Sequence, residues 1–512
     1  SSLIPLIPHP PHPLPSSIHI HYYLILMYMK SDPCEKGMSF NDCELAILRV
    51  AVDQAEDIQS RKDTNTPEVK KMMDIVEQFL VKKGLICYGG TAINNILPKQ
   101  DQFYDLNVEI PDYDFFSPDP LKDARELADI YVKEGFSEVE AKSGVHYGTF
   151  KVFVNFIPVA DITLLDPVLF KAIKKDSISI AGIRYCPPNF LRMLGYLELS
   201  RPAGDVSRWE KVQKRINLLN KHYPLKIERC NYENFNRKFE DDDAERIKTI
   251  YEVSKDSFVN QGVVFFGGYA VSLYSKYMPR KIRSKFSADP DFDVLSEHPH
   301  KTCVILKERL EDAGITGVKI TKKKALGEVI AEHYEVRVGK DAIAFVYYPL
   351  SCHSYNVVHE GGRSVRVATI DTMISFYLSF IYAGRPYYDD ARILCMANFL
   401  FQVQQSNRLK QKGLLRRFSI ACYGTQKTLG DIRGDRASKF LELKNKRGTK
   451  EYDAWFLKYR PGDGKIDGKS TESNTGSKTA SKTMKKKAPI KKRKSTKTRL
   501  STRKNFLARF LR

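Results

Sequence analysis

Two aspartates separated by one residue follow a glycine pair in the segment CYGGTAINNILPKQDQFYDLNVEIPDYDFFSPDP, residues 87–120. On an extended strand, residues i and i+2 point to the same face, so the carboxylates of Asp112 and Asp114 meet at one point. Two like charges held this close repel each other unless cations lie between them, and Mg²⁺ or Mn²⁺ prefers such oxygen ligands. A solvated polar strand face is the commoner explanation of an isolated acid pair, so the pair needs further support.

A third acid gives that support. The segment NFIPVADIT, residues 155–163, is an apolar strand with a single acid, Asp161, near its end. A carboxylate inside such a strand is costly to bury without a cation or hydrogen bonds. Three carboxylates on adjacent strands predict a two-metal phosphoryl-transfer site, where one ion activates a hydroxyl and the other holds the triphosphate and stabilises the leaving pyrophosphate.

The glycine pair indicates where a phosphate chain would lie. Gly89 and Gly90 follow an apolar strand and precede a helical pattern. Glycines let backbone N–H groups approach phosphate, and the start of the next helix adds partial positive charge. The Thr91 hydroxyl would be a further donor. Because a lone glycine pair is a weak signal, a tight strand–helix turn is the alternative.

These elements occur twice in the chain. VKKGLICYGGTAINNIL (81–97) matches NQGVVFFGGYAVSLYSKY (260–277), and IPDYDFFS (110–117) matches ADPDFDVLS (288–296). Each copy continues into two strands that open with His-Tyr. We therefore predict an α/β (α+β) fold of tandem modules, each a mixed β-sheet flanked by helices.

The second copy keeps its glycine and acid pairs, at Gly267, Gly268, Asp291 and Asp293. Its third acid is missing. Alignment on the hairpin turn places Tyr347 at that position, whereas alignment on the following proline places Cys352 there. Neither carries a carboxylate, so we predict a non-catalytic second copy that packs against the first and helps to hold RNA.

Four segments follow from these patterns. Residues 1–37 are predicted to be a disordered or spurious leader, and 461–512 a disordered basic tail. Residues 38–250 form the predicted catalytic domain, with a helical lead-in and a helical extension. The second, degenerate domain takes 251–460. The apolar run YYLILMYM in the leader is shorter than the ~18 residues of a membrane span, so no membrane partner is expected.

The net charge of +22 over 512 residues favours a polyanionic partner. Residues 461–512 carry seventeen Lys or Arg and three acids, which is +14 and leaves 22 − 14 = +8 for the rest of the chain. Lys491, Lys492 and Arg493 in the tail are candidate RNA contacts. A nuclear-localisation signal and a merely solubilising tail are the alternatives.

Weaker signals lie elsewhere. The predicted helix in RPAGDVSRWEKVQKR (201–215) carries Arg208, Trp209 and Lys211, which suits base stacking and phosphate contact, although a tryptophan in the core is an equal explanation. Candidate nucleotide contacts also include Asn94, Lys151 and Asp166. The nine cysteines show no C-x-x-C and no zinc-site spacing, which predicts free thiols in a reducing compartment.

Taken together, these motifs resemble the DNA polymerase β-like nucleotidyltransferases, whose signature is a glycine pair, an acid pair and a third acid. The phrases YGGTAINNILPKQDQFYD, IPDYDFFSPDP, FVNFIPVADIT and PYYDDARILCMANFLF are similar to the poly(A) polymerase catalytic subunits of large (giant) cytoplasmic DNA viruses. The likeness runs from about residue 40 to 450. It implies ATP as substrate, an RNA 3′ end as acceptor, and two Mg²⁺ or Mn²⁺ ions.

The resemblance also implies roles for single residues. Asp112, Asp114 and Asp161 would be catalytic metal ligands, while Gly89, Gly90 and Thr91 would bind ATP. The resemblance further implies either a homodimer or a complex with a cap-methyltransferase-type partner. A cytoplasmic location follows, in the virion or viral factory for a viral protein, and the basic tail adds the nucleus as an alternative.

The leading hypothesis is therefore a template-independent polynucleotide adenylyltransferase that polyadenylates mRNA. A CCA-adding or oligoadenylate-type transferase is the alternative among enzymes. A catalytically inactive RNA-binding scaffold is the alternative of another class. The intact set of three acids argues against a scaffold, because an inert protein has no reason to keep them on apolar strands.

Overall fold

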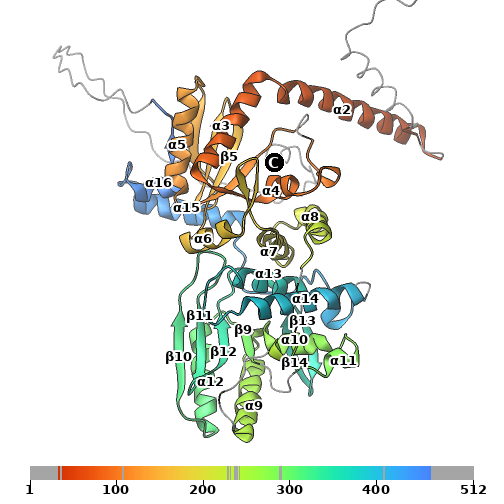
Figure 1. Ribbon diagram of the computed structural model, residues 1–512, viewed down its shortest axis with the longest axis vertical. Helices are drawn as coiled ribbons and strands as arrows, with labels where there is room; N and C mark the ends of the chain where they lie inside the picture. The colour runs from red at the N-terminus through yellow and green to blue at the C-terminus, as the bar shows by residue number, and fades with distance from the viewer. Residues whose placement is uncertain are drawn as a thin grey trace, which may run out of the picture. The chain divides into compact units, whose positions relative to one another are not determined.

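The computed structural model describes most of the chain between residues 33 and 462, in the ranges 33–34, 37–105, 109–225, 227, 230, 232–235, 240, 243–286, 291–407 and 410–462. The predicted tail beyond 462, and almost all of the predicted leader, lie outside these residues. The described part contains two mixed β-sheets flanked by helices, which confirms the predicted fold class (Figure 1). No described helix combines the length and the apolar character that crossing a membrane requires.

The first sheet has eight strands. Their order is β16 (Lys458–Tyr459), β3 (Val139–Ser143), β4 (Thr149–Val154), β5 (Ile157–Leu164), β2 (Tyr113–Ser117), β1 (Ile86–Cys87), β7 (Ile183–Tyr185) and β6 (Ile178–Ile180). The helices of this part of the chain are α2 (Phe40–Thr64), α3 (Pro67–Lys83), α4 (Gly89–Ile96), α5 (Pro120–Lys133), α6 (Pro167–Lys175), α7 (Pro188–Leu199) and α8 (Trp209–His222).

The second sheet repeats this arrangement. Its order is β10 (Val318–Lys323), β11 (His333–Val338), β12 (Asp341–Tyr347), β9 (Phe292–Leu295), β8 (Val264–Phe265), β14 (Arg363–Ala368), β13 (His353–Glu360) and β15 (Cys422–Tyr423). In both sheets the strand after the glycine turn runs antiparallel to the strand before it and parallel to the next strand of the sheet. The predicted duplication is thus confirmed in the topology.

The second module has its own set of helices. They are α9 (Ala244–Asn260), α10 (Gly268–Ser275), α11 (Arg280–Arg283), α12 (Pro299–Asp312), α13 (Ile370–Phe380) and α14 (Asp390–Asn407). By position in the repeat, α13 corresponds to α7, and these two helices pack against each other (Figure 1). The backbone N–H of Ser354 also donates to the Ser200 carbonyl at 2.8 Å. Equivalent elements therefore meet where the modules join.

Helix α3 shows why the first module begins where it does. The Thr66 side chain caps the helix by accepting from the Val69 N–H, and Pro67 occupies the first turn. Gly84 ends it in the left-handed conformation at φ 60°. Residues at helical spacing, from Met72 to Leu80, are buried. Strand β1 and the glycine turn follow directly, so this helix fixes the start of the candidate site.

The last described elements return to the first sheet. The prediction placed residues up to 460 in the second module, but β16 pairs with β3, Tyr459 opposite Ala141. Helices α15 (Leu429–Leu443) and α16 (Lys450–Phe456) precede it (Figure 1). Asp453 of α16 accepts from Arg125 of α5 at 2.5 Å. Two-residue strands carry no clear periodicity, which is why the sequence placed this segment with its neighbours in the chain.

The prediction that all cysteines are free thiols is wrong. The structure pairs Cys34 with Cys43, Cys230 with Cys395, and Cys352 with Cys422. The remaining cysteines, Cys87, Cys186 and Cys303, are buried thiols. Sequence spacing missed the pairs because two of them join residues 165 and 70 positions apart, which only the tertiary fold brings together.

Candidate active site

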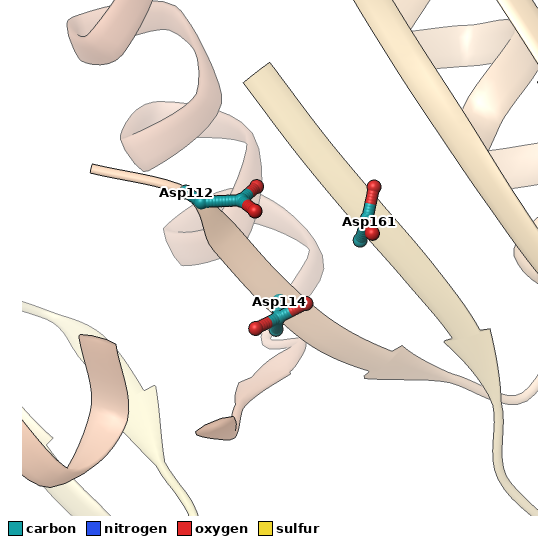
Figure 2. Close-up of side chains that lie close together, drawn as sticks. All are labelled: Asp112, Asp114 and Asp161. Carbon is teal, nitrogen blue, oxygen red and sulfur yellow. The ribbon is translucent and has the colours of Figure 1, made fainter. Parts of the chain in front are cut away.

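Strands β2 and β5 bring the three predicted acids together. They are parallel neighbours in register, with Asp114 opposite Asp161, and Asp112 lies just before β2 begins. One carboxylate oxygen from each lies within 4.8 Å of the others. Figure 2 shows Asp112 and Asp161 extending toward the same space, with Asp114 below them. The convergence that the sequence predicts is present, and the role of these residues as metal ligands stays a prediction.

The electrostatics of this cluster favour a cation. The pKa of Asp114 is raised to about 7, mainly by burial and then by the neighbouring carboxylates Asp112 and Asp161, while Lys151 and Arg208 oppose the change. Loss of hydration, with the charge of Asp161, also raises the pKa of Asp112. The fold therefore keeps these carboxylates close together although their negative charges repel one another.

The third acid, Asp161, has only part of its carboxylate satisfied by protein groups. Asp161 Oδ2 forms an ion pair with Lys151 Nζ, which extends from the facing position on β4. Its other oxygen, Oδ1, is buried and has no hydrogen-bond partner among the described residues. An unsatisfied buried carboxylate oxygen beside two more carboxylates fits the ligand set of a divalent cation, because hard cations take oxygen ligands.

The glycine turn packs directly on this cluster. Gly89 begins α4 with φ +71°, a conformation that other residues rarely adopt. A Cβ atom here would lie 2.6 Å from Asp114 Oδ2, so any side chain would collide with the acid. The Tyr88 N–H donates to the Asp114 carbonyl at 2.9 Å, which fixes the turn against β2. The sequence prediction of a bare turn facing the acids agrees with this geometry.

Thr91 has a positioning contact instead of a free hydroxyl. Its Oγ1 donates to the Asp112 carbonyl at 2.8 Å, and the side chain is 5% exposed. This hydrogen bond ties the residue before β2 to helix α4 and so orients the first acid. Its predicted contact with ATP, like those of Gly89 and Gly90, stays a prediction.

Sequence reasoning did not place Tyr104 and Arg215 beside the glycine turn. A Cβ on Gly90 would meet the Tyr104 hydroxyl, and would lie 2.7 Å from Arg215 Nη2. The side chain of Asn94, a predicted nucleotide contact, is instead buried and accepts from the N–H groups of Phe103 and Tyr104 at 2.8 and 2.9 Å. No sequence signal places Tyr104 and Arg215 together, because 111 positions separate them.

The candidate RNA residues near α8 have structural contacts. The Trp209 indole N–H donates to the Glu198 carbonyl at 3.1 Å, and its ring lies 5.7 Å from that of Phe418. Arg208 is exposed and pairs with Glu198 at 3.4 Å, while Lys211 is exposed. These contacts favour the core explanation for Trp209, and an RNA role for the three residues stays a prediction. Lys491, Lys492 and Arg493 lie outside the described residues.

The last candidate nucleotide contacts also have structural partners. Asp166 caps α6 by accepting from the Val168 N–H at 2.8 Å. Lys151 reaches the site itself through its ion pair with Asp161. Among Asn94, Lys151 and Asp166, Lys151 is therefore the residue whose charged group lies beside the acid cluster.

The second copy differs from the first at the third acid. Asp293 of β9 lies opposite Phe345 of β12, just as Asp114 lies opposite Asp161. The two alignments that placed Tyr347 or Cys352 at this position were wrong. The same bulge occurs in both hairpins, between Val336 and Arg337 here and between Val152 and Phe153 in the first module, so it shifts both copies alike. The alignments failed because a turn or a proline in the sequence does not fix which residues pair across two strands. The prediction that no carboxylate stands there is nevertheless correct.

Fold and site together show two modules of the same α/β topology, with an acid cluster beside the glycine turn of the first. Residues 74–205, which contain the glycine turn and all three acids, match the family described as "Poly(A) polymerase catalytic subunit". The chain is also similar to a known structure, that of the Megavirus polyadenylate synthase, with a TM-score of 0.69. That match covers 84% of this chain and 87% of the other at 23% identity, and at this identity it shows the fold.

Curated relatives carry the same description. A protein of African swine fever virus (strain Badajoz 1971 Vero-adapted), assigned by name to the poly(A) polymerase catalytic subunits, is 32% identical over 176 residues, or 33% of this chain. One from Acanthamoeba polyphaga mimivirus is 31% identical over 223 residues, or 41% of this chain. The matches span 37% and 36% of those proteins, little more than a third of their length. The resemblance predicted from the motifs is confirmed over the segment that holds the site.

Proposed function

We propose that this protein is a template-independent polynucleotide adenylyltransferase that adds AMP from ATP to RNA 3′ ends, as in mRNA polyadenylation. One observation carries the proposal: three carboxylates converge beside a glycine turn, inside the segment that matches the poly(A) polymerase family. The excess of negative charge at this point is a cost to the folded protein. Such a cost is typical of a site that binds metal and phosphate.

Asp112, Asp114 and Asp161 would hold two divalent ions, Mg²⁺ or Mn²⁺. When bound, the ions would activate the attacking hydroxyl and neutralise charge on the triphosphate. The chain's own residues position the reactants. Lys151 holds the Asp161 carboxylate, and Thr91 fixes the backbone before β2. The start of α4 presents backbone N–H groups and partial positive charge to a phosphate chain.

The reaction forms one bond and breaks one. The terminal ribose hydroxyl of RNA attacks the α-phosphorus of ATP in line, which forms an O–P bond. The bond from that phosphorus to the bridging oxygen of the β-phosphate breaks, and pyrophosphate leaves. Proximity and orientation in such a site account for a large part of the rate enhancement.

Further parts of the proposal rest on the resemblance. They are the identity of the metal, self-association as a homodimer, a cap-methyltransferase-type partner and a cytoplasmic location, or a nuclear one directed by the basic tail. RNA contacts by the tail and by the exposed cations near α8 belong to the same group. The relatives from African swine fever virus and the mimivirus support a viral setting.

Extension of a labelled RNA primer tests the function. The purified protein is given each of the four nucleotides with Mg²⁺ or Mn²⁺, and Asp112→Asn serves as the matched inactive control. Extension with ATP far above the other nucleotides is expected. Equal use of CTP would favour the CCA-adding alternative, and long products only with a double-stranded activator would favour the oligoadenylate type. RNA binding without extension under any condition would favour the inactive scaffold.

A further inference from the structure

A guanidinium group lies against the second glycine of the turn. Arg215, near the middle of α8, places Nη2 at 2.7 Å from where a Gly90 Cβ would be. The same Nη2 donates to the Tyr104 hydroxyl at 2.6 Å. The guanidinium also lies over the rings of Phe103 and Tyr104, at 5.1 and 5.8 Å from their centroids. Arg215 therefore reaches the start of α4 from a separate helix.

This guanidinium forms no close ion pair with a carboxylate among the described residues, although its charge opposes the rise in the pKa of Glu198 that burial causes. Among the described residues, no acid comes within 4.0 Å of it, whereas its neighbours Arg208 and Lys214 on the same segment pair with Glu198 and Glu210. Arg215 instead lies at the N-terminal end of α4, which itself carries partial positive charge. Two positive groups at one point favour an anion between them, since arginine prefers the planar oxygens of phosphate and carboxylate.

The surrounding contacts hold Arg215 in this place. Asn94 fixes the backbone of the loop that carries Tyr104. Asp101 in the same loop accepts from Lys221 at 2.8 Å and contacts His222 Nε2 at 2.6 Å, both at the end of α8. Helix α8 is thus attached to the loop at its middle and at its end. A guanidinium held by so many contacts loses little conformational entropy on binding a ligand.

The order of contacts along the turn indicates which anion fits. Gly89 touches Asp114 of the acid cluster, and the next residue, Gly90, touches Arg215. A nucleotide whose α-phosphate lies at the acids would extend its β- and γ-phosphates along the turn. We propose that Arg215 binds the pyrophosphate portion of ATP, with Tyr104 as the positioning residue that holds the guanidinium there. This inference rests on the proposed function and assigns a residue to it.

Binding measurements on the full-length protein test the proposal directly. Arg215→Gln keeps a donor for the Tyr104 hydroxyl but removes the charge, and Lys214→Gln on the neighbouring exposed position is the matched control. Loss of a charge-assisted hydrogen bond should raise the Kd for ATP by about 10- to 100-fold, and the Kd for AMP by less than about 2-fold. Arg215→Lys should recover part of the affinity, and Tyr104→Phe should give an intermediate loss.

A second readout separates this role from a merely structural one. Inorganic pyrophosphate should inhibit primer extension by wild type and Lys214→Gln at similar concentrations, and Arg215→Gln should need about 10-fold more. Thermal unfolding reports whether each variant folds. Equal losses of ATP and AMP affinity, or unchanged inhibition by pyrophosphate in a folded variant, would overturn the proposal. Failure of wild type to bind ATP would instead overturn the proposed function on which it rests.

Discussion

The two modules share a strand order but differ in what lies beside the acid pair. In the first, Asp161 faces Asp114 across the parallel pair of strands, and Lys151 faces Asp161 from the next strand. In the second, Phe345 takes the place of the third acid, and Glu335 takes the place of the lysine. Both the acid and its cation are therefore changed together.

The second acid pair is also enclosed. Asp291 and Asp293 are 3% and 8% exposed, whereas Asp112 and Asp114 of the first module are more open to solvent. The Asp293 backbone carbonyl accepts from the N–H groups of Phe266 and Gly267 at 2.9 and 3.3 Å, as the Asp114 carbonyl accepts from Tyr88 in the first module. The turn and the strand after it thus have a structural use in both copies. The third acid is present in the first copy alone.

The largest expected effect comes from the first module's acids. Asp112→Asn should lower kcat for primer extension with ATP by on the order of a hundredfold or more, because it removes a charged metal ligand and several kcal/mol of transition-state stabilisation. The variant should fold normally, since it relieves repulsion. Single-turnover extension at saturating ATP and Mg²⁺ checks this. Activity within 10-fold of wild type would exclude Asp112 from the catalytic set.

Restoring an acid to the second module should damage the protein without creating a site. Phe345 is fully buried, so Phe345→Asp loses its apolar burial and places a carboxylate in the core, at a cost of about 3–5 kcal/mol in the free energy of unfolding. Urea unfolding measures this, with Val357→Asp on the exposed part of β13 as control. A variant as stable as wild type that also binds Mn²⁺ at a second site would show that one added acid is enough to create a metal site in the second module.

The local features of the site could be predicted from the sequence, whereas its long-range contacts could not. The glycine turn, the i and i+2 acids and the third acid on an apolar strand each follow from residue type and spacing within one segment. Residue pairs distant in sequence do not. The Arg215–Tyr104 contact, the Cys352–Cys422 pair and the β16–β3 pairing all depend on how separate segments dock. The position of Phe345 opposite Asp293 was missed for the same reason, because a turn or a proline in the sequence does not fix strand pairing.

The acids of the first module should cost stability when metal is absent. The folded pKa of Asp114 is about 7, well above the ordinary value near 3.9. A raised carboxyl pKa means that the folded state binds the proton more tightly, so its contribution to stability is present below about pH 4 and is lost as pH rises through about 7. Asp114→Asn mimics the protonated form and should stabilise the protein in EDTA by up to about 4 kcal/mol at pH 8, with little change at pH 4.

Thermal or urea unfolding at both pH values, with chelator, measures this difference. Asp119→Asn, on an acid that follows β2, is a suitable control because it lies outside the cluster. A gain in stability that is equal at pH 4 and pH 8 would show that relief of charge is not its cause. Excess Mg²⁺ should reduce the advantage of the variant, since metal bound to the wild-type cluster stabilises the folded state.

The smallest expected effect concerns the second module's acid pair. Asp291→Asn combined with Asp293→Asn keeps the shape of both side chains and leaves the backbone hydrogen bonds of the turn intact. Phe345 and Glu335 occupy the positions of the third acid and its lysine. The two aspartates therefore lack the third carboxylate that completes the cluster in the first module. Primer extension by the double variant should stay within a few-fold of wild type, while Asp112→Asn in the same assay loses on the order of a hundredfold or more. Melting temperatures of both variants show whether each is folded. A folded double variant that loses as much turnover as Asp112→Asn would make the second module catalytic and would remove the distinction between the two copies.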